Sequence, residues 1–112
     1  MTLEELRLKI DVLDRQLVEL LSERARAAQM VGKLKAATSL PVYEPAREQV
    51  VYANVRAANK GPLPDIELTH IYERIIDVMR ALQRDELASE RNAQAQPGHA
   101  AGANAPETGK KQ

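Results

Sequence analysis

Arg24 and Lys35 are two cations that could bind an anion together. They lie eleven residues apart. In an α-helix, eleven steps of about 100° make three turns plus about 20°, so both residues would share one stripe, about 16 Å apart. The leucine spacing before Arg24 predicts an apolar residue at that position, and a buried guanidinium is stable only when it is paired. The alternative is that both side chains extend past the apolar stripe into water.

Arg7 is an ordinary exposed arginine within one chain and becomes relevant to this site only in a dimer. It lies seventeen residues before Arg24. That separation is about 25 Å along a straight helix, so the two side chains cannot meet within one chain. If a second copy packs antiparallel, Arg7 of one chain approaches Arg24 of the other.

Three more polar residues could complete such a site. Arg47 and Glu48 begin a predicted helix, where the helix dipole favours Glu48 but disfavours a cation such as Arg47. Gln83 is the last residue of a stripe at helical spacing, which otherwise consists of Tyr72, Ile76 and Met79. A buried amide needs hydrogen-bond partners, and the alternative for Gln83 is a position near a frayed helix end.

Other kinds of chemistry find little support in the composition. The chain has no cysteine, and His70 and His99 are isolated, so we expect no metal site. It has 16 basic and 16 acidic residues, a balance that argues against general binding of nucleic acid or of an anionic membrane. Cations and hydrogen-bond donors without a nucleophile suit the binding of a small dianion, because arginines bind carboxylates well.

Three helices are predicted to position these residues, so we expect an all-α chain. A long helix is predicted over residues 3–38, a short one over 46–59 and a medium one from 65 to about 90, with loops that contain prolines between them. Thr2 and Glu5 fit a capping box at the start of the first helix. No segment shows the sustained alternation of a strand.

The first predicted helix is too long to be covered by the rest of one chain. Its apolar residues follow a heptad-like stripe of alternating three- and four-residue steps, formed by Leu3, Leu6, Ile10, Leu13, Leu17 and Leu20. At about 1.5 Å per residue the helix is roughly 50 Å long, which exceeds the width of a small domain. Self-association is therefore expected.

The end of the chain differs in composition from the rest. Residues 92–112 contain mainly Ala, Gly, Gln, Pro and Asn, so we expect a disordered polar tail after a helical domain of residues 1–91. We find no apolar run that could span a bilayer and no signal-peptide pattern, so we expect a cytoplasmic protein.

Several motifs together resemble the all-helical (type II) chorismate mutases, with family-like order and spacing over residues 3–85. They are Leu6-Arg7-x-x-Ile10-Asp11-x-x-Asp14, Leu20-Leu21-x-Glu23-Arg24, Val31-Gly32-x-x-Lys35, Pro41-Val42-x-x-Pro45-x-Arg47-Glu48, and Gly61-Pro62-Leu63-Pro64 before Ile71-Tyr72-x-x-Ile75-Ile76. The resemblance implies a monofunctional enzyme that rearranges chorismate to prephenate without a cofactor, in the synthesis of phenylalanine and tyrosine. It also implies an intertwined homodimer of three-helix chains with two shared active sites.

The resemblance assigns roles to individual residues. Arg7 from the partner chain, Arg24 and Arg47 match the arginines that hold the two carboxylates of the substrate. Lys35 and Gln83 match the pair that binds its ether oxygen, and stabilises the charge that develops there. Glu48 matches the carboxylate that binds the ring hydroxyl, which makes Lys35, Gln83 and Glu48 the expected catalytic residues.

Two positions depart from the family pattern. Glu44 stands where the family often has Asp as a further substrate contact, and Met79 stands where some members have a small polar residue near a carboxylate.

Two other functions remain open at this point. One is an isochorismate-pyruvate lyase of the same fold, against which Glu48 argues, and the other is a non-catalytic helical dimerisation module, which would not explain Arg24 or Gln83.

Overall fold

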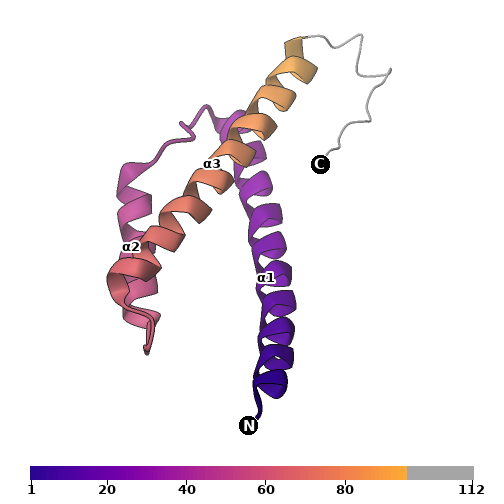
Figure 1. Ribbon diagram of the computed structural model, residues 1–112. Coiled ribbons are helices and arrows are strands. Elements are labelled where there is room, and N and C mark those ends of the chain that lie inside the picture. Colours follow the sequence, from indigo (N-terminus) through magenta and orange to yellow (C-terminus); the bar gives the residue numbers. More distant parts are fainter. Residues whose placement is uncertain (96–112) are drawn as a thin grey trace.

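The chain folds into three helices in a computed structural model that describes residues 1–95 (Figure 1). Helix α1 spans Leu3–Thr38, α2 spans Pro45–Ala58 and α3 spans Asp65–Ala95. Residues 1–95 contain no strand, which confirms the prediction of an all-α chain with one long, one short and one medium helix. Within the same residues, no helix is both long and apolar enough to cross a membrane.

The helix ends form where the local sequence predicts them. At the start of α1, the Thr2 hydroxyl accepts from the backbone N–H of Glu5 and the Glu5 carboxylate accepts from the backbone N–H of Thr2, which is the predicted capping box. Pro45 occupies the first turn of α2, where its missing N–H costs no helical bond. Gly61 adopts φ 72° in the turn before α3, a conformation that glycine reaches without strain.

Helix α3 connects the other two helices. It packs along the C-terminal half of α1 and against α2, whereas α1 and α2 do not pack on each other within residues 1–95 (Figure 1). Gly32 of α1 makes the α1–α3 approach possible. A Cβ atom on this residue would lie 2.9 Å from Glu86 Cβ and 3.0 Å from the carbonyl oxygen of Gln83, so no larger side chain fits without a shift.

The three helices bury very little within one chain. The molecule measures 62 × 33 × 14 Å, so its thinnest dimension is close to the diameter of a single helix. Among residues 1–93, the buried apolar side chains are Ala28, Ile76 and Met79. The predicted leucine stripe in the N-terminal half of α1 lies exposed, with Leu6 at 42% and Leu17 at 56%. The described part of one chain therefore lacks the apolar core that a domain of this length normally has.

The C-terminal boundary lies later than the sequence indicates. Helix α3 continues to Ala95, four residues past the expected end of the helical domain at residue 91. The rest of the predicted tail, residues 96–112, lies outside the described residues.

Candidate dianion-binding site

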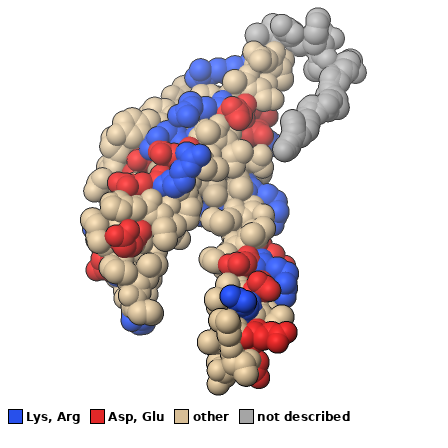
Figure 2. Space-filling view, viewed as in Figure 1, with Lys and Arg blue, Asp and Glu red and all other residues tan. Residues whose placement is uncertain are grey.

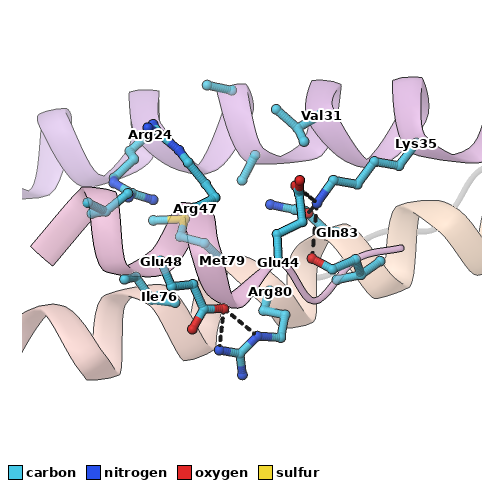
Figure 3. Close-up of a pocket in the computed structure, with 14 residues that line it drawn as sticks. Arg24, Val31, Lys35, Glu44, Arg47, Glu48, Ile76, Met79, Arg80 and Gln83 are labelled. Atoms are coloured by element: carbon cyan, nitrogen blue, oxygen red, sulfur yellow. Dashed lines mark hydrogen bonds and ion pairs between the residues drawn. The ribbon is translucent and has the colours of Figure 1, made fainter. Parts of the chain in front are cut away.

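A cavity of about 480 Å³ lies between the three helices, within the size range of small-molecule sites. Seven of the eight site residues predicted from the sequence line it, namely Arg24, Lys35, Glu44, Arg47, Glu48, Met79 and Gln83. Figure 3 shows Arg24 and Arg47 toward one end and Lys35, Glu44 and Gln83 toward the other. The eighth residue, Arg7, does not line the cavity of its own chain.

Lys35 is buried at one end of the cavity and is fully hydrogen-bonded. Its side chain is only 6% exposed. The ammonium group donates to the carbonyl oxygen of Val42 at 3.0 Å and to Gln83 Oε1 at 2.9 Å. It also forms an ion pair with Glu44 Oε1 at 2.7 Å. These three partners match the three donors of an ammonium group, so a bound ligand must replace one of them.

Glu44 is the partner of Lys35 that can be replaced most easily. Its side chain is 46% exposed, so water can solvate the carboxylate when the ion pair opens. Gln83 holds Lys35 from α3, and the Val42 carbonyl holds it from the connector, residues 39–44 between α1 and α2. A ligand oxygen could therefore take the place of Glu44 without unpacking a helix.

Gln83 contacts Lys35 through its amide oxygen, which leaves the amide N–H groups available as donors. These N–H groups have no acceptor among residues 1–95. The close approach of α1 and α3 at Gly32 brings the Gln83 backbone next to the helix that carries Lys35. The sequence-based interpretation of Gln83 as a frayed helix end is therefore wrong for this structure, since the amide is bonded at the cavity wall.

Arg24 and Arg47 provide unpaired positive charge at the other end of the cavity. Arg24 is half-buried, and its guanidinium carbon lies 6.0 Å from the centre of the Tyr72 ring. Neither arginine forms an ion pair with a carboxylate within residues 1–95. Both therefore remain free to bind the carboxylates of a ligand.

Glu48 has a partner that the sequence analysis missed. Arg80 of α3 donates to Glu48 Oε2 from Nε at 3.1 Å and from Nη2 at 2.6 Å. This hydrogen bond to Glu48 raises the pKa of Arg80 above its usual value. The two residues are 32 positions apart, so no local spacing predicts the pair. The available signal was the position of Arg80 directly after Met79 on the helix that carries Gln83.

Met79 closes the cavity as an apolar wall, with only 5% of its surface exposed. Its thioether can accept only a weak hydrogen bond, so this position contributes shape rather than binding to a carboxylate. The cavity lining as a whole carries four cations and two carboxylates, a formal net charge of two positive units. On the face seen in Figure 2, charges of both signs are interspersed. The cavity lining therefore carries an excess of positive charge, although the chain as a whole has 16 basic and 16 acidic residues.

Comparison with known proteins decides the family. The sequence model described as chorismate mutase type II matches residues 6–84. The chain belongs to this family. A chorismate mutase from Methanocaldococcus jannaschii is 31% identical over 91 residues, covering 80% of this chain and 92% of that protein. The solved structure of chorismate mutase (form II) from Thermus thermophilus superposes with a TM-score of 0.71 at 34% identity, covering 72% of this chain and 92% of the other.

Larger relatives contain the same region as one part of a longer protein. The bifunctional chorismate mutase/prephenate dehydratase of Pseudomonas aeruginosa is 42% identical to this chain over 87 residues. The match covers 73% of this chain and 24% of that protein, and a relative from Aquifex aeolicus gives the same two shares. The chain thus spans about a quarter of the length of these curated relatives.

Proposed function

We propose that this chain is a chorismate mutase, which rearranges chorismate to prephenate. The observation that carries the proposal is the arrangement of the cavity. Unpaired Arg24 and Arg47 lie toward one end, and the bonded Lys35–Gln83 pair lies toward the other. Such a cavity can hold a dianion by its carboxylates and offer donors to an oxygen between them. The product, prephenate, would serve the synthesis of phenylalanine and tyrosine.

The arginines act by positioning the substrate. In this reaction one ether C–O bond breaks while a C–C bond forms within the same molecule, and no atom is gained or lost. The enolpyruvyl group must lie over the ring, so fixing the two carboxylates at separate arginines selects the reactive conformer. Arg24 and Arg47 of one chain bind the carboxylates, and the partner subunit's Arg7 completes this binding site.

Lys35 and Gln83 act on the charge that develops during the reaction. As the C–O bond breaks, negative charge grows on the ether oxygen, and a preorganised donor there is worth about 3 kcal/mol. Gln83 is held by Lys35 through its oxygen, so its N–H groups can point at the substrate. Lys35 becomes available when the ether oxygen replaces Glu44, its solvent-exposed partner. No cofactor takes part in this mechanism.

Glu48 is the group proposed to bind the ring hydroxyl. Its side chain is 18% exposed and lies in the first turn of α2, at the cavity wall. A carboxylate accepts hydrogen bonds from a hydroxyl, and Arg80 compensates its charge. Met79 is buried at the wall of the same cavity and excludes water from the apolar side of the substrate.

The active form is proposed to be a homodimer in which two α1 helices run antiparallel. The thin shape of one chain and the exposed stripe on α1 support this assembly, because burying that stripe would supply the missing apolar core. Seventeen residues separate Arg7 from Arg24. An antiparallel pair of α1 helices centred between these positions would therefore bring Arg7 of each chain to the cavity of the other.

The direct test is to mix the purified protein with chorismate and follow both the loss of chorismate and the formation of prephenate. We expect turnover well above the spontaneous rate and no pyruvate. A parallel assay with isochorismate distinguishes the alternative lyase, which would release pyruvate. Failure to accelerate the loss of chorismate would contradict the proposed function.

A further inference from the structure

Arg80 is a cavity-lining residue to which the proposed mechanism assigns no contact with the substrate. Its side chain is 23% exposed and reaches from α3 to Glu48 at the start of α2. A third hydrogen bond runs from its Nη1 to Asp77 Oδ1 at 3.3 Å, one turn earlier on α3. Figure 3 shows the Arg80 guanidinium pointing at the Glu48 carboxylate.

Both hydrogen bonds from Arg80 to Glu48 end on the same carboxylate oxygen. Nε and Nη2 each donate to Oε2, and no residue among 1–95 donates to Oε1. A fork that binds a single oxygen fixes the rotation of the carboxylate while leaving the other oxygen available as an acceptor. Glu48 therefore presents its second carboxylate oxygen, Oε1, as a preoriented acceptor for a ligand hydroxyl.

The same guanidinium also holds the connector before α2. Its central carbon lies 5.1 Å from the centre of the Tyr43 ring, within the range of a cation–π contact. Tyr43 stands between Val42 and Glu44, and both of these neighbours bind Lys35. Arg80 thus contacts the segment that supplies two of the three partners of Lys35.

Helix α2 depends on α3 for its position. Within residues 1–95 it packs on α3 and not on α1, so the Glu48 end of α2 is fixed mainly by contacts with α3. The Arg80–Glu48 pair is the ion pair that joins these two helices in the described residues. Loss of the pair would free the helix start that carries both Glu48 and Arg47.

From these contacts we infer that Arg80 is a positioning residue of this site, one that aims the free oxygen of Glu48 at the substrate hydroxyl and anchors the 42–44 connector beside Lys35. The inference rests on the proposed function. Arg80 touches neither the carboxylates of the substrate nor its ether oxygen in this arrangement. Its effect on the reaction passes through Glu48 and through the connector.

Substitution is the appropriate test, because an arginine guanidinium stays charged at every pH at which the protein can be assayed. Arg80→Gln removes the positive charge and the paired hydrogen bonds from Nε and Nη2 to Glu48. Arg80→Lys keeps the charge but loses the fork and the planar contact with Tyr43. Arg84→Gln is the matched control, because Arg84 is exposed on the same helix and forms no ion pair or hydrogen bond within residues 1–95.

The chorismate assay should separate these variants by KM. Because the Glu48–hydroxyl contact is made in both ground and transition states, Arg80→Gln should raise KM at least about tenfold, while kcat falls less. Arg80→Lys should recover part of the loss, and Arg84→Gln should match the wild type. Guanidinium chloride at tens of millimolar should lower the raised KM of Arg80→Ala and leave the KM of Arg84→Ala unchanged. Sodium chloride at the same concentration is the ionic control.

A double-mutant cycle with Glu48→Gln distinguishes positioning from simple stabilisation. If Arg80 acts through Glu48, Arg80→Gln should have little further effect on KM in the Glu48→Gln background. Additive effects on KM would overturn the inference, and so would equal KM values in Arg80→Gln and Arg84→Gln. Thermal unfolding of each variant verifies that it is folded. Absence of turnover by the wild type would instead refute the proposed function, so the two failures are distinguishable.

Discussion

The two halves of α1 belong to one uninterrupted helix, yet their surroundings in the chain differ completely. In the C-terminal half, Ala28 and Lys35 are about 95% buried against α3 and the connector. In the N-terminal half, Ile10 and Leu17 are more than half exposed, although they continue the same stripe. This difference supports the proposal that one apolar stripe serves two partners, α3 of its own chain and a second copy of α1.

The site reflects the same division. Its Lys35 end lies on the half of α1 that packs within the chain, and this end is complete. Its arginine end begins at Arg24, where the packed half meets the exposed one. The two arginines at this end have no ion-pair partner among the described residues 1–95. We therefore expect substitutions in the exposed half to act through assembly, and substitutions in the packed half to act on the chemical step.

The largest effect is expected from a charge in the exposed stripe. Leu17→Asp would bury one unpaired carboxylate from each chain in the proposed interface, at a cost of several kcal/mol. We expect loss of the dimer in size-exclusion chromatography with light scattering, and loss of nearly all mutase activity. Ser22→Asp adds the same charge on the opposite side of α1 and should remain a dimer. An active, monomeric Leu17→Asp protein would contradict the division described above.

The next largest effect is expected at the buried end of the site. Lys35→Met keeps most of the side-chain volume but removes the donor to the ether oxygen, and kcat should fall about 10²- to 10³-fold. Lys33→Met, two residues earlier on the exposed side of α1, should stay within about threefold of the wild type, as is usual for surface changes. A change in KM alone would mean that Lys35 attracts the dianion without stabilising the transition state.

A smaller effect is expected from widening the contact between α1 and α3. Gly32→Ala places a methyl group against Glu86 Cβ and the Gln83 carbonyl, and such overpacking costs about 1–3 kcal/mol. We expect a lower midpoint of thermal unfolding and a reduced kcat, because Gln83 would move away from Lys35. Helix propensity alone favours alanine by about 1 kcal/mol, so an unfolding midpoint above that of the wild type would show that the helices separate without cost.

The smallest effect is expected at Glu44. Glu44→Gln removes the exchangeable ion pair with Lys35 but keeps an acceptor of similar size. Because this carboxylate is about half exposed, kcat/KM should change by less than about tenfold in steady-state assays. A loss above a hundredfold would instead identify Glu44 as a direct substrate contact.

The sequence predicted the helices well because their signals are local. The capping box at Thr2, the prolines of the connector and the turn at Gly61 each act within a few residues. The resemblance to a family then identified seven residues that the structure brings to one cavity. The alternative of solvated side chains is wrong for Lys35, which is buried and bonded.

Long-range pairs could not be predicted in the same way. The Arg80–Glu48 pair and the Arg80–Tyr43 contact depend on how α3 lies against α2, which no spacing within either helix specifies. The same holds for the Glu44–Lys35 pair, which depends on the path of the connector. The position of Arg7 relative to the cavity depends on a second chain, so it stays a prediction.

Complementation between two inactive variants tests the shared site most directly. Arg7→Ala and Arg24→Ala should each be inactive as homodimers, because every site lacks one arginine. After subunit exchange, half of the dimers are mixed and each has one intact site, so activity should recover to about a quarter of the wild-type value. Failure to recover any activity, with exchange verified by native mass spectrometry, would contradict a site completed by the partner subunit's Arg7.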